Sequence, residues 1–217
     1  MFAPVERAGW YRPVMRRRAG GLTVPEILVG SFISLLMATA LFAVVSQLKT
    51  QAHTTDAVMK ARYDMQFLFR ALGDAFDKTT AEGVHVTADN QKVSLQRVDG
   101  MASNGTRAWS PFVTFYVFDA SVGQVLQGRV ELAEIGLTHQ PALPAVITDG
   151  DLDLMVSIRR ADGKLKPVAN DIEGFAVDKP SPLTARLHLT AVVKSGKYKD
   201  ERVEDERTFF FSSAAEL

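Results

Sequence analysis

The sequence predicts an α+β fold in which a long N-terminal helix packs against an antiparallel β-sheet head. Residues 31–72 contain neither Gly nor Pro, the two residues that most often interrupt a helix. After Gly83 the apolar spacing changes from steps of three or four residues to alternation, with many β-branched and aromatic side chains. Because these segments follow one helix and do not alternate with further helices, they favour an α+β fold.

The first 21 residues precede a long apolar run. The run extends from Ile27 to Leu48, and charged residues stand only at its borders, Glu26 and Lys49. At about 1.5 Å per residue, a helix of this length spans about 33 Å, close to the roughly 30 Å hydrocarbon core of a bilayer. The run therefore predicts a transmembrane helix over residues 22–48.

Charge predicts the orientation of this helix in a membrane. The leader, residues 1–21, carries five arginines against one acid, Glu6. Positively charged flanks stay cytoplasmic, so the bulk of the chain is expected on the outside. Without the leader, 20 of the 25 basic and 24 of the 25 acidic residues remain, which makes the exported part mildly acidic. The sequence has no Cys, so we expect core burial without disulfides to hold this part together.

A short motif joins the leader to the apolar run. It consists of Gly20, Gly21, Leu22, Thr23, Val24, Pro25 and Glu26. An ordinary secretory signal has its small-residue cleavage site after a shorter apolar stretch, whereas here the paired glycines come first. The motif resembles the class III signal of type IV prepilins and type II secretion pseudopilins. This resemblance implies that a membrane prepilin peptidase cleaves after Gly21 and that the new N-terminus at Leu22 is methylated.

Leu22 and Pro25 depart from the pattern of that family, which usually has Phe first and an aliphatic residue fourth after the cleaved bond. Pro25 is compatible with a helix starting at Leu22, because the first four N–H groups of a helix have no acceptor within it. Before cleavage, Gly20, Gly21 and Pro25 disfavour a continuous helix across the scissile bond, which leaves that bond extended enough for a protease.

Glu26 is the residue with the clearest expected role. The resemblance implies that its carboxylate pairs with the amine of Leu22 in a neighbouring subunit and so aligns each new protomer. In a low-dielectric setting, two opposite charges left alone cost more than the pair, so such docking is physically reasonable. The alternative is that Glu26 only lies in the headgroup region, favoured there by the dipole at a helix N-terminus.

Helical periodicity continues beyond the membrane run, over residues 49–83. Met65, Phe69, Leu72 and Phe76 recur at three- and four-residue steps, with Leu68 beside them. Together with the apolar run they predict one helix from about Thr23 to Lys78, on the order of 80 Å long. Its first half is expected to face lipid and its second half to be amphipathic.

The head, residues 84–217, is expected to be an antiparallel sheet. The predicted strands are Val84–Thr87, Lys92–Val98, Phe112–Phe118, Gln124–Leu132, Asp153–Arg159, Ile172–Val177, Ala185–Val193 and Val203–Phe211. The Pro-containing stretches Gly136–Gly150 and Lys179–Leu183 are predicted to be loops. The order and size of these pieces resemble the J-type minor pseudopilins and the PilW-type minor pilins. The segments that carry this likeness are Asp171–Phe175, Leu187–Thr190 and Thr208–Phe211.

Other residue patterns favour ordinary structural roles. Asp149, Asp151 and Asp153 form an acidic cluster, but the spacing of a calcium loop and its closing Glu are absent, so we expect a solvated turn. The four histidines show no metal-ligand spacing. Phosphate-loop and nucleophile-elbow motifs are absent as well, so we expect no enzyme activity, cofactor or metal. The basic run 194–202 is interrupted by acids and does not predict nucleic-acid binding. The aromatic residues of 109–118 are expected in the sheet core.

The sequence thus predicts a structural subunit, a minor pilin or pseudopilin of the inner membrane with a single span and a periplasmic head. The resemblance implies three kinds of partner beside lipid: the prepilin peptidase, other pilins contacted through the N-terminal helix, and an inner-membrane assembly platform. Type II secretion, a surface pilus and DNA uptake remain open as the system, as do tip and priming positions. The alternative is a single-pass anchored protein whose periplasmic head binds a ligand or partner.

Overall fold

The computed structural model describes residues 23–101, 105–181, 183–193 and 200–211. The chain divides into two compact units, one ending at Thr50 and one starting at Gln51. Helix α1, Val24–Phe76, contributes residues to both units. It ends two residues before the predicted end, because the chain turns at Asp77–Thr79 into the short 3₁₀ helix η1, Ala81–Gly83.

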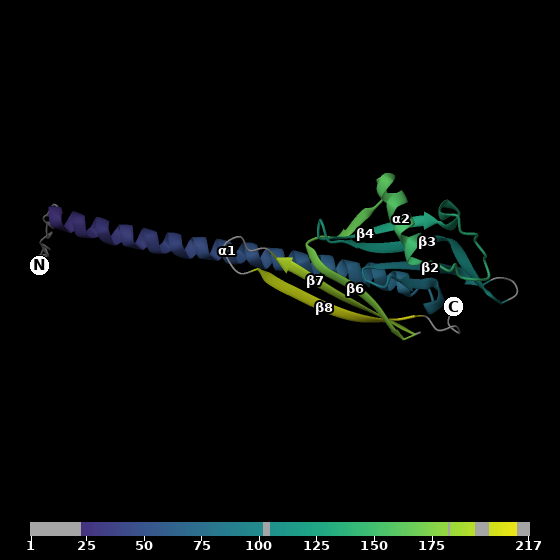
Figure 1. Ribbon diagram of the computed structural model, residues 1–217. Coiled ribbons are helices and arrows are strands. Elements are labelled where there is room, and N and C mark those ends of the chain that lie inside the picture. The colour runs from purple at the N-terminus through teal and green to yellow at the C-terminus, as the bar shows by residue number, and fades with distance from the viewer. Residues whose placement is uncertain (1–22, 102–104, 182, 194–199, 212–217) are drawn as a thin grey trace, which may run out of the picture. The chain divides into compact units, whose positions relative to one another are not determined.

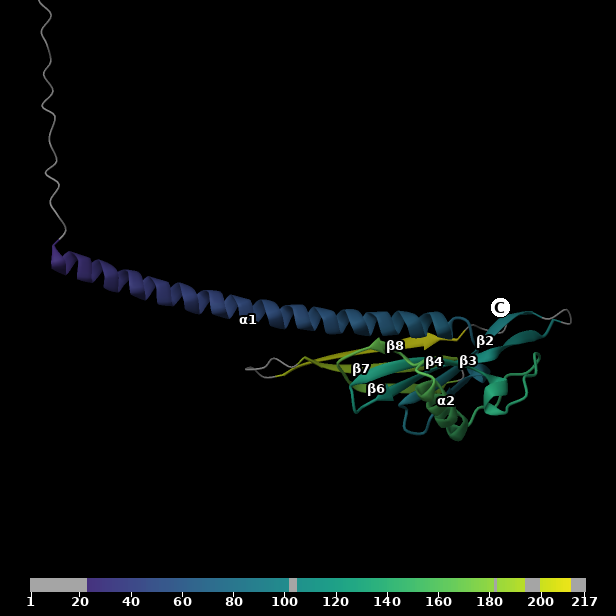
Figure 2. The same cartoon turned by 90° about the horizontal axis from the view of Figure 1, so that it is seen from above.

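Two antiparallel sheets form the second unit together with its part of α1 and the helix α2, Asp149–Ala161 (Figure 1 and, from above, Figure 2). The five-stranded sheet has the order β1-β2-β3-β4-β5, and the three-stranded sheet has the order β6-β7-β8. Strands of the first sheet are β1 Val84–Val86, β2 Lys92–Met101, β3 Arg107–Asp119, β4 Gln124–Glu131 and β5 Lys166–Ala169. Those of the second are β6 Ile172–Ser181, β7 Thr184–Val193 and β8 Glu201–Phe210. The predicted α+β class is therefore confirmed, with two sheets in place of the one expected.

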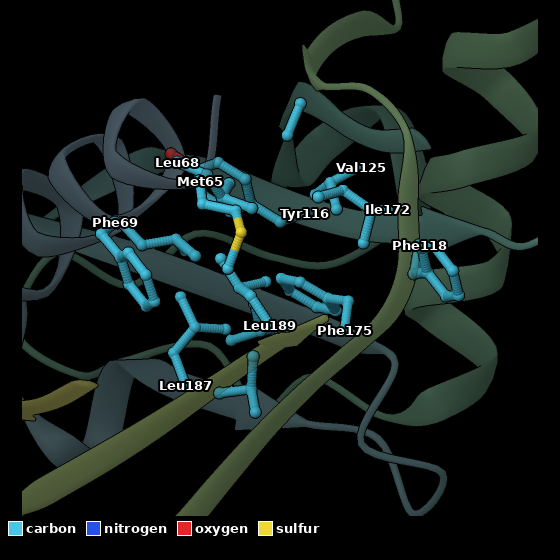
Figure 3. Close-up of a cluster of buried hydrophobic side chains, with 14 of the residues drawn as sticks. Met65, Leu68, Phe69, Tyr116, Phe118, Val125, Ile172, Phe175, Leu187 and Leu189 are labelled. Atoms are coloured by element: carbon cyan, nitrogen blue, oxygen red, sulfur yellow. The ribbon is translucent and has the colours of Figure 1, made fainter. Parts of the chain in front are cut away.

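The main hydrophobic core packs on one face of the part of α1 that lies in the second unit. Met65, Leu68 and Phe69 are nearly fully buried against side chains from both sheets, including Tyr116 and Leu189 (Figure 3). The amphipathic spacing predicted for residues 49–83 is what places these side chains on one face of the helix. Residues that are distant in sequence, from β2 to β8, therefore pack on a single helical stripe.

A second core lies on the other face of the five-stranded sheet. Val113, Phe115 and Val117 alternate along β3 with residues of the main core, so this strand contributes to both cores. Leu152 and Met155 of α2 cover this face, together with the 3₁₀ helix η2, Leu132–Ile135. The five-stranded sheet is thus buried on both sides, by α1 and the smaller sheet on one side and by α2 on the other.

The strand predicted at Asp153–Arg159 is wrong, because these residues belong to α2. Leu152, Met155 and Arg159 are buried at helical spacing. Thr148 caps the helix, since its hydroxyl oxygen accepts from the Asp151 N–H at 3.2 Å and the Asp151 carboxylate accepts from the Thr148 N–H at 2.9 Å. This capping box contributes about 1 kcal/mol. It favours a helix in a segment whose apolar residues also recur at every second position, as in a strand.

The predicted loops are also shorter than expected. Asp149 and Gly150 belong to α2, so the first loop ends before them. β6 extends to Ser181 and β7 starts at Thr184, so most of the second predicted loop belongs to a strand. The prediction also missed β5, which pairs with β4 through Pro167 and Lys166. A strand of four residues that includes a proline carries little local signal.

Candidate assembly surface

The predicted signal motif is described from Thr23 onward, and Gly20, Gly21 and Leu22 lie outside the described residues. Helix α1 starts at Val24, with Pro25 in its first turn. In this position the missing N–H of proline removes no helical hydrogen bond. The first intrahelical bond at this end runs from the Ile27 N–H to the Thr23 carbonyl at 3.1 Å.

Glu26 is held by the residue that precedes the helix. The backbone N–H of Thr23 donates to Glu26 Oε2 at 2.8 Å, and the Thr23 hydroxyl donates to the same oxygen at 2.8 Å. The spacing Thr-x-x-Glu is that of a capping box, in which the third helical residue satisfies the N–H of the cap residue. The sequence prediction missed this contact, although the spacing could have revealed it. The contact agrees with the alternative in which Glu26 serves the helix N-terminus.

The helical residues up to Leu48 present apolar side chains on every side. All large apolar side chains from Val24 to Leu48 are exposed, by 48% to 76%. The helix is long and apolar enough to span a membrane by length and composition. A surface of this size requires lipid or apolar protein around it.

Hydroxyl groups within this apolar segment are satisfied by the helix itself. Ser31, Ser34, Thr39 and Ser46 each donate to a backbone carbonyl three or four residues earlier, at 2.8 Å in every case. Such bonds remove the need for an external polar partner. The segment is therefore compatible both with a lipid environment and with close packing against other apolar helices.

The acidic cluster at the start of α2 is engaged within the chain. Asp149 lies 2.7 Å from His85 Nε2, Asp151 completes the capping box with Thr148, and Asp153 accepts from Lys92 Nζ at 2.6 Å. The hydrogen bond from His85 is the main cause that lowers the pKa of Asp149. Asp149 and Asp153 thus fasten α2 to β1 and β2, Asp151 caps the helix, and the solvated turn expected here is instead a helix N-terminus. Among the described residues, no group of three potential metal ligands comes together.

The aromatic residues of β3 belong mainly to the cores. Trp109, Phe115, Tyr116 and Phe118 are buried, and burial raises the pKa of Tyr116 to about 12. Phe112 is partly exposed, with the guanidinium of Arg129 4.3 Å above its ring. The expectation of sheet core is therefore correct for all of them except Phe112.

A charged network on the α2 side fixes the loop after β4. Arg159 is buried and donates to the Arg129 carbonyl and to Glu134 Oε1, each at 2.5 Å, and to Asp162 Oδ2 at 3.0 Å. The hydrogen bond from Arg159 is the main cause that lowers the pKa of Glu134. These contacts join η2, β4 and the end of α2, and we assign them a structural role.

Comparison with family models, with curated proteins and with solved structures finds no match for this chain.

Proposed function

We propose that the chain is a structural subunit, a minor pilin or pseudopilin of the type IV pilus and type II secretion class. It is processed by a prepilin peptidase after Gly21, methylated at Leu22, held in the inner membrane with its head in the periplasm, and then assembled into a pilus or pseudopilus. The observation that carries this proposal is the position of Glu26, five residues after Gly21 and directly before a 22-residue uncharged run.

The helix properties support an assembly role. Its apolar residues up to Leu48 are exposed on all sides, and its hydroxyls are satisfied internally. A helix of this kind packs on like helices through shape and dispersion, without interhelical hydrogen bonds. The same surface can thus contact lipid while the subunit waits and other stems after assembly on the inner-membrane platform.

Glu26 is the proposed docking group for the methylated amine of Leu22 in a neighbouring subunit. Both hydrogen bonds from Thr23 go to Oε2. A carboxylate has about four lone-pair sites, so the group can keep its contact with Thr23 and accept from an ammonium as well. The local contact then orients the acid, and the amine of the incoming subunit supplies the opposite charge.

The head is compatible with a tip or priming position, or with the rival function of a membrane-anchored protein that binds a partner. The two functions differ at the N-terminus of the mature protein. Only the filament subunit requires that Leu22 become a free, methylated amine.

The decisive experiment is N-terminal sequencing with mass spectrometry of the full chain extracted from membranes. In cells with an active prepilin peptidase we expect an N-terminus at methylated Leu22. In cells that lack the peptidase we expect the leader to be retained, which serves as the control. A chain that keeps residues 1–21 in the presence of the peptidase would rule out the proposal.

A further inference from the structure

A polar pocket of about 230 Å³ lies between α1 and the strands β2, β3 and β4 of the five-stranded sheet. Ala71 and Ala75 form its helical side, and their short side chains leave space that larger residues would fill. Sites for drug-sized ligands measure about 300–1,000 Å³, so this pocket has room for a single small ring. We call it the α1–β3 pocket.

Hydroxyl and amide groups line the sheet side of the α1–β3 pocket. Thr114 and Tyr116 come from β3, and Gln127 comes from β4. The Gln127 amide donates to the Tyr116 hydroxyl oxygen at 3.0 Å. Burial, and after it the negative charge of Asp74, raise the pKa of Tyr116 to about 12, so its hydroxyl stays protonated at neutral pH. This wall therefore offers both donors and acceptors to a ligand that carries several hydroxyl groups.

Three basic and two acidic side chains line the same pocket: Lys78, Arg97, Arg129, Asp74 and Asp99. Arg97 lies 3.2 Å from Asp99, but the two side chains are 60% and 47% exposed, so this pair is weak. Within the described part of the chain, Lys78, Arg129 and Asp74 form no ion pair. The pocket thus has one net positive charge and two cations that no carboxylate contacts.

Arg129 is the cation whose position is best defined. Its guanidinium lies 4.3 Å above the Phe112 ring, and its backbone carbonyl accepts from the buried Arg159 at 2.5 Å. Contact with an aromatic ring uses the face of a guanidinium and leaves the N–H groups at its edge available. Two such N–H groups match the two oxygens of a carboxylate.

We propose that the α1–β3 pocket binds a small acidic sugar, a single uronic-acid ring. Arg129 and Lys78 bind its carboxylate, while Asp74 and the Thr114 and Gln127 side chains bind its hydroxyl groups. A neutral sugar would leave both cations without a counter-charge, and a simple carboxylate would leave the hydroxyls, the amide and Asp74 without partners. This binding function goes beyond the proposed structural role and requires neither cleavage nor assembly.

A ligand-observed NMR titration of the full chain in detergent micelles tests the proposal. The probes are glucuronate, glucose, which lacks the carboxylate, and acetate, which lacks the hydroxyls. Empty micelles serve as the blank. We expect glucuronate to bind with a Kd on the order of 1 mM, as is usual for so small a ligand, and glucose and acetate to bind at least about tenfold more weakly.

Substitutions locate the binding site. Arg129→Gln removes the charge but keeps a polar side chain, and it should weaken glucuronate binding about tenfold. Lys78→Gln makes the same test from the helical side. Thr114→Val keeps the shape without the hydroxyl and should weaken binding about threefold. Arg62→Gln is the matched control, because Arg62 is an exposed arginine of α1 that does not line the pocket, and it should change nothing. The Tm of each variant shows that it is folded.

Three results would overturn the proposal. The first is a folded chain that gives no saturable signal with glucuronate. The second is an affinity for acetate or glucose equal to that for glucuronate, since the pocket would then recognise only a charge or only a polyol. The third is unchanged glucuronate binding by both Arg129→Gln and Lys78→Gln. Because a chain that keeps residues 1–21 can be titrated in the same way, the result is independent of the filament function.

Discussion

At the start of α1, the backbone N–H and the hydroxyl of Thr23 both donate to the same carboxylate oxygen of Glu26, at 2.8 Å each. The acid of the signal motif therefore has two donors within its own chain. The carboxylate does not depend on a second molecule for its hydrogen bonds. A buried or lipid-facing acid without such partners is costly.

Replacement of Glu26 separates processing from assembly. Glu26→Val should leave cleavage after Gly21 intact and abolish incorporation into filaments, because the partner of the Leu22 amine is lost. Glu26→Asp keeps the charge on a shorter side chain and should retain part of the incorporation. The measurement compares the cleaved fraction with the filament-bound fraction of each variant. Normal incorporation of Glu26→Val would contradict the docking role.

Removal of the Thr23 hydroxyl tests whether the local contact orients Glu26. Thr23→Val keeps the shape and the backbone donor but loses one of the two hydrogen bonds, so we expect slower incorporation into filaments at unchanged cleavage. Thr23→Ser keeps the hydroxyl and should behave like the natural protein. A pulse-chase measurement of incorporation into filaments distinguishes the two variants. Equal incorporation rates for Thr23→Val and Thr23→Ser would show that the hydroxyl does not orient Glu26.

Substitution of Gly128 tests how tightly the second core is packed. A Cβ at this position of β4 would lie 2.3 Å from Cζ of Phe115, so Gly128→Ala should destabilise the head by about 1–3 kcal/mol. Adding Phe115→Leu should recover part of that loss. Gly150→Ala is the control, because its nearest non-neighbour atom is 3.8 Å away and alanine favours the helix. Thermal unfolding of the detergent-solubilised chain measures all three variants.

Arg159 and Arg160 are adjacent in α2 but differ in burial and partners. Arg159→Met removes the guanidinium donor from Glu134, Asp162 and the Arg129 carbonyl and should cost about 2–4 kcal/mol. Arg160 is 60% exposed and pairs with Asp119 at 2.9 Å, so Arg160→Met should cost less than about 1 kcal/mol. Chemical denaturation of both variants gives the comparison. Equal costs would show that the Arg159 network does not stabilise the head.

The contact between Asp149 and His85 predicts a pH-dependent contribution to the stability of the head. The pKa of Asp149 lies below its ordinary value of 3.8, mainly because of the hydrogen bond with His85. A depressed carboxylate pKa stabilises the fold above the unfolded-state pKa, and this contribution is lost as the pH falls through the folded-state pKa. Asp149→Asn should therefore lower the Tm at neutral pH. The difference in Tm between the variant and the natural protein should disappear below about pH 4.

A double-mutant comparison provides the control for this prediction. His85→Phe should give the same pH profile as Asp149→Asn, and the double variant should show no further change. Additive losses would mean that the two residues stabilise the head independently of each other.

Local patterns in the sequence predicted most elements of the fold but not their partners. The amphipathic spacing of Met65, Phe69 and Phe76 predicted the buried face of α1, and alternation predicted β2, β3 and β7. The division into two sheets depends on pairing between distant strands, such as Phe175 with Leu189, which no local pattern specifies.

The segment that became α2 shows where local patterns are ambiguous. Leu152, Leu154 and Val156 recur at every second residue, as in a strand, with apolar Met155 among the intervening positions. Leu152, Met155 and Arg159 instead fit a helix. The capping box at Thr148 and Asp151 was the deciding signal. At the candidate site, the sequence predicts a role for Glu26, and the same capping pattern would have predicted Thr23 as its hydrogen-bond partner.

The internally bonded hydroxyls of Ser31, Ser34, Thr39 and Ser46 bear on the work that would be needed to move the N-terminal helix from lipid to an apolar protein environment. No polar bond to a surrounding molecule has to break at these four residues when the helix exchanges one apolar environment for another. The free-energy difference between the two environments is then determined mainly by how closely the new neighbours fit the surface of the helix.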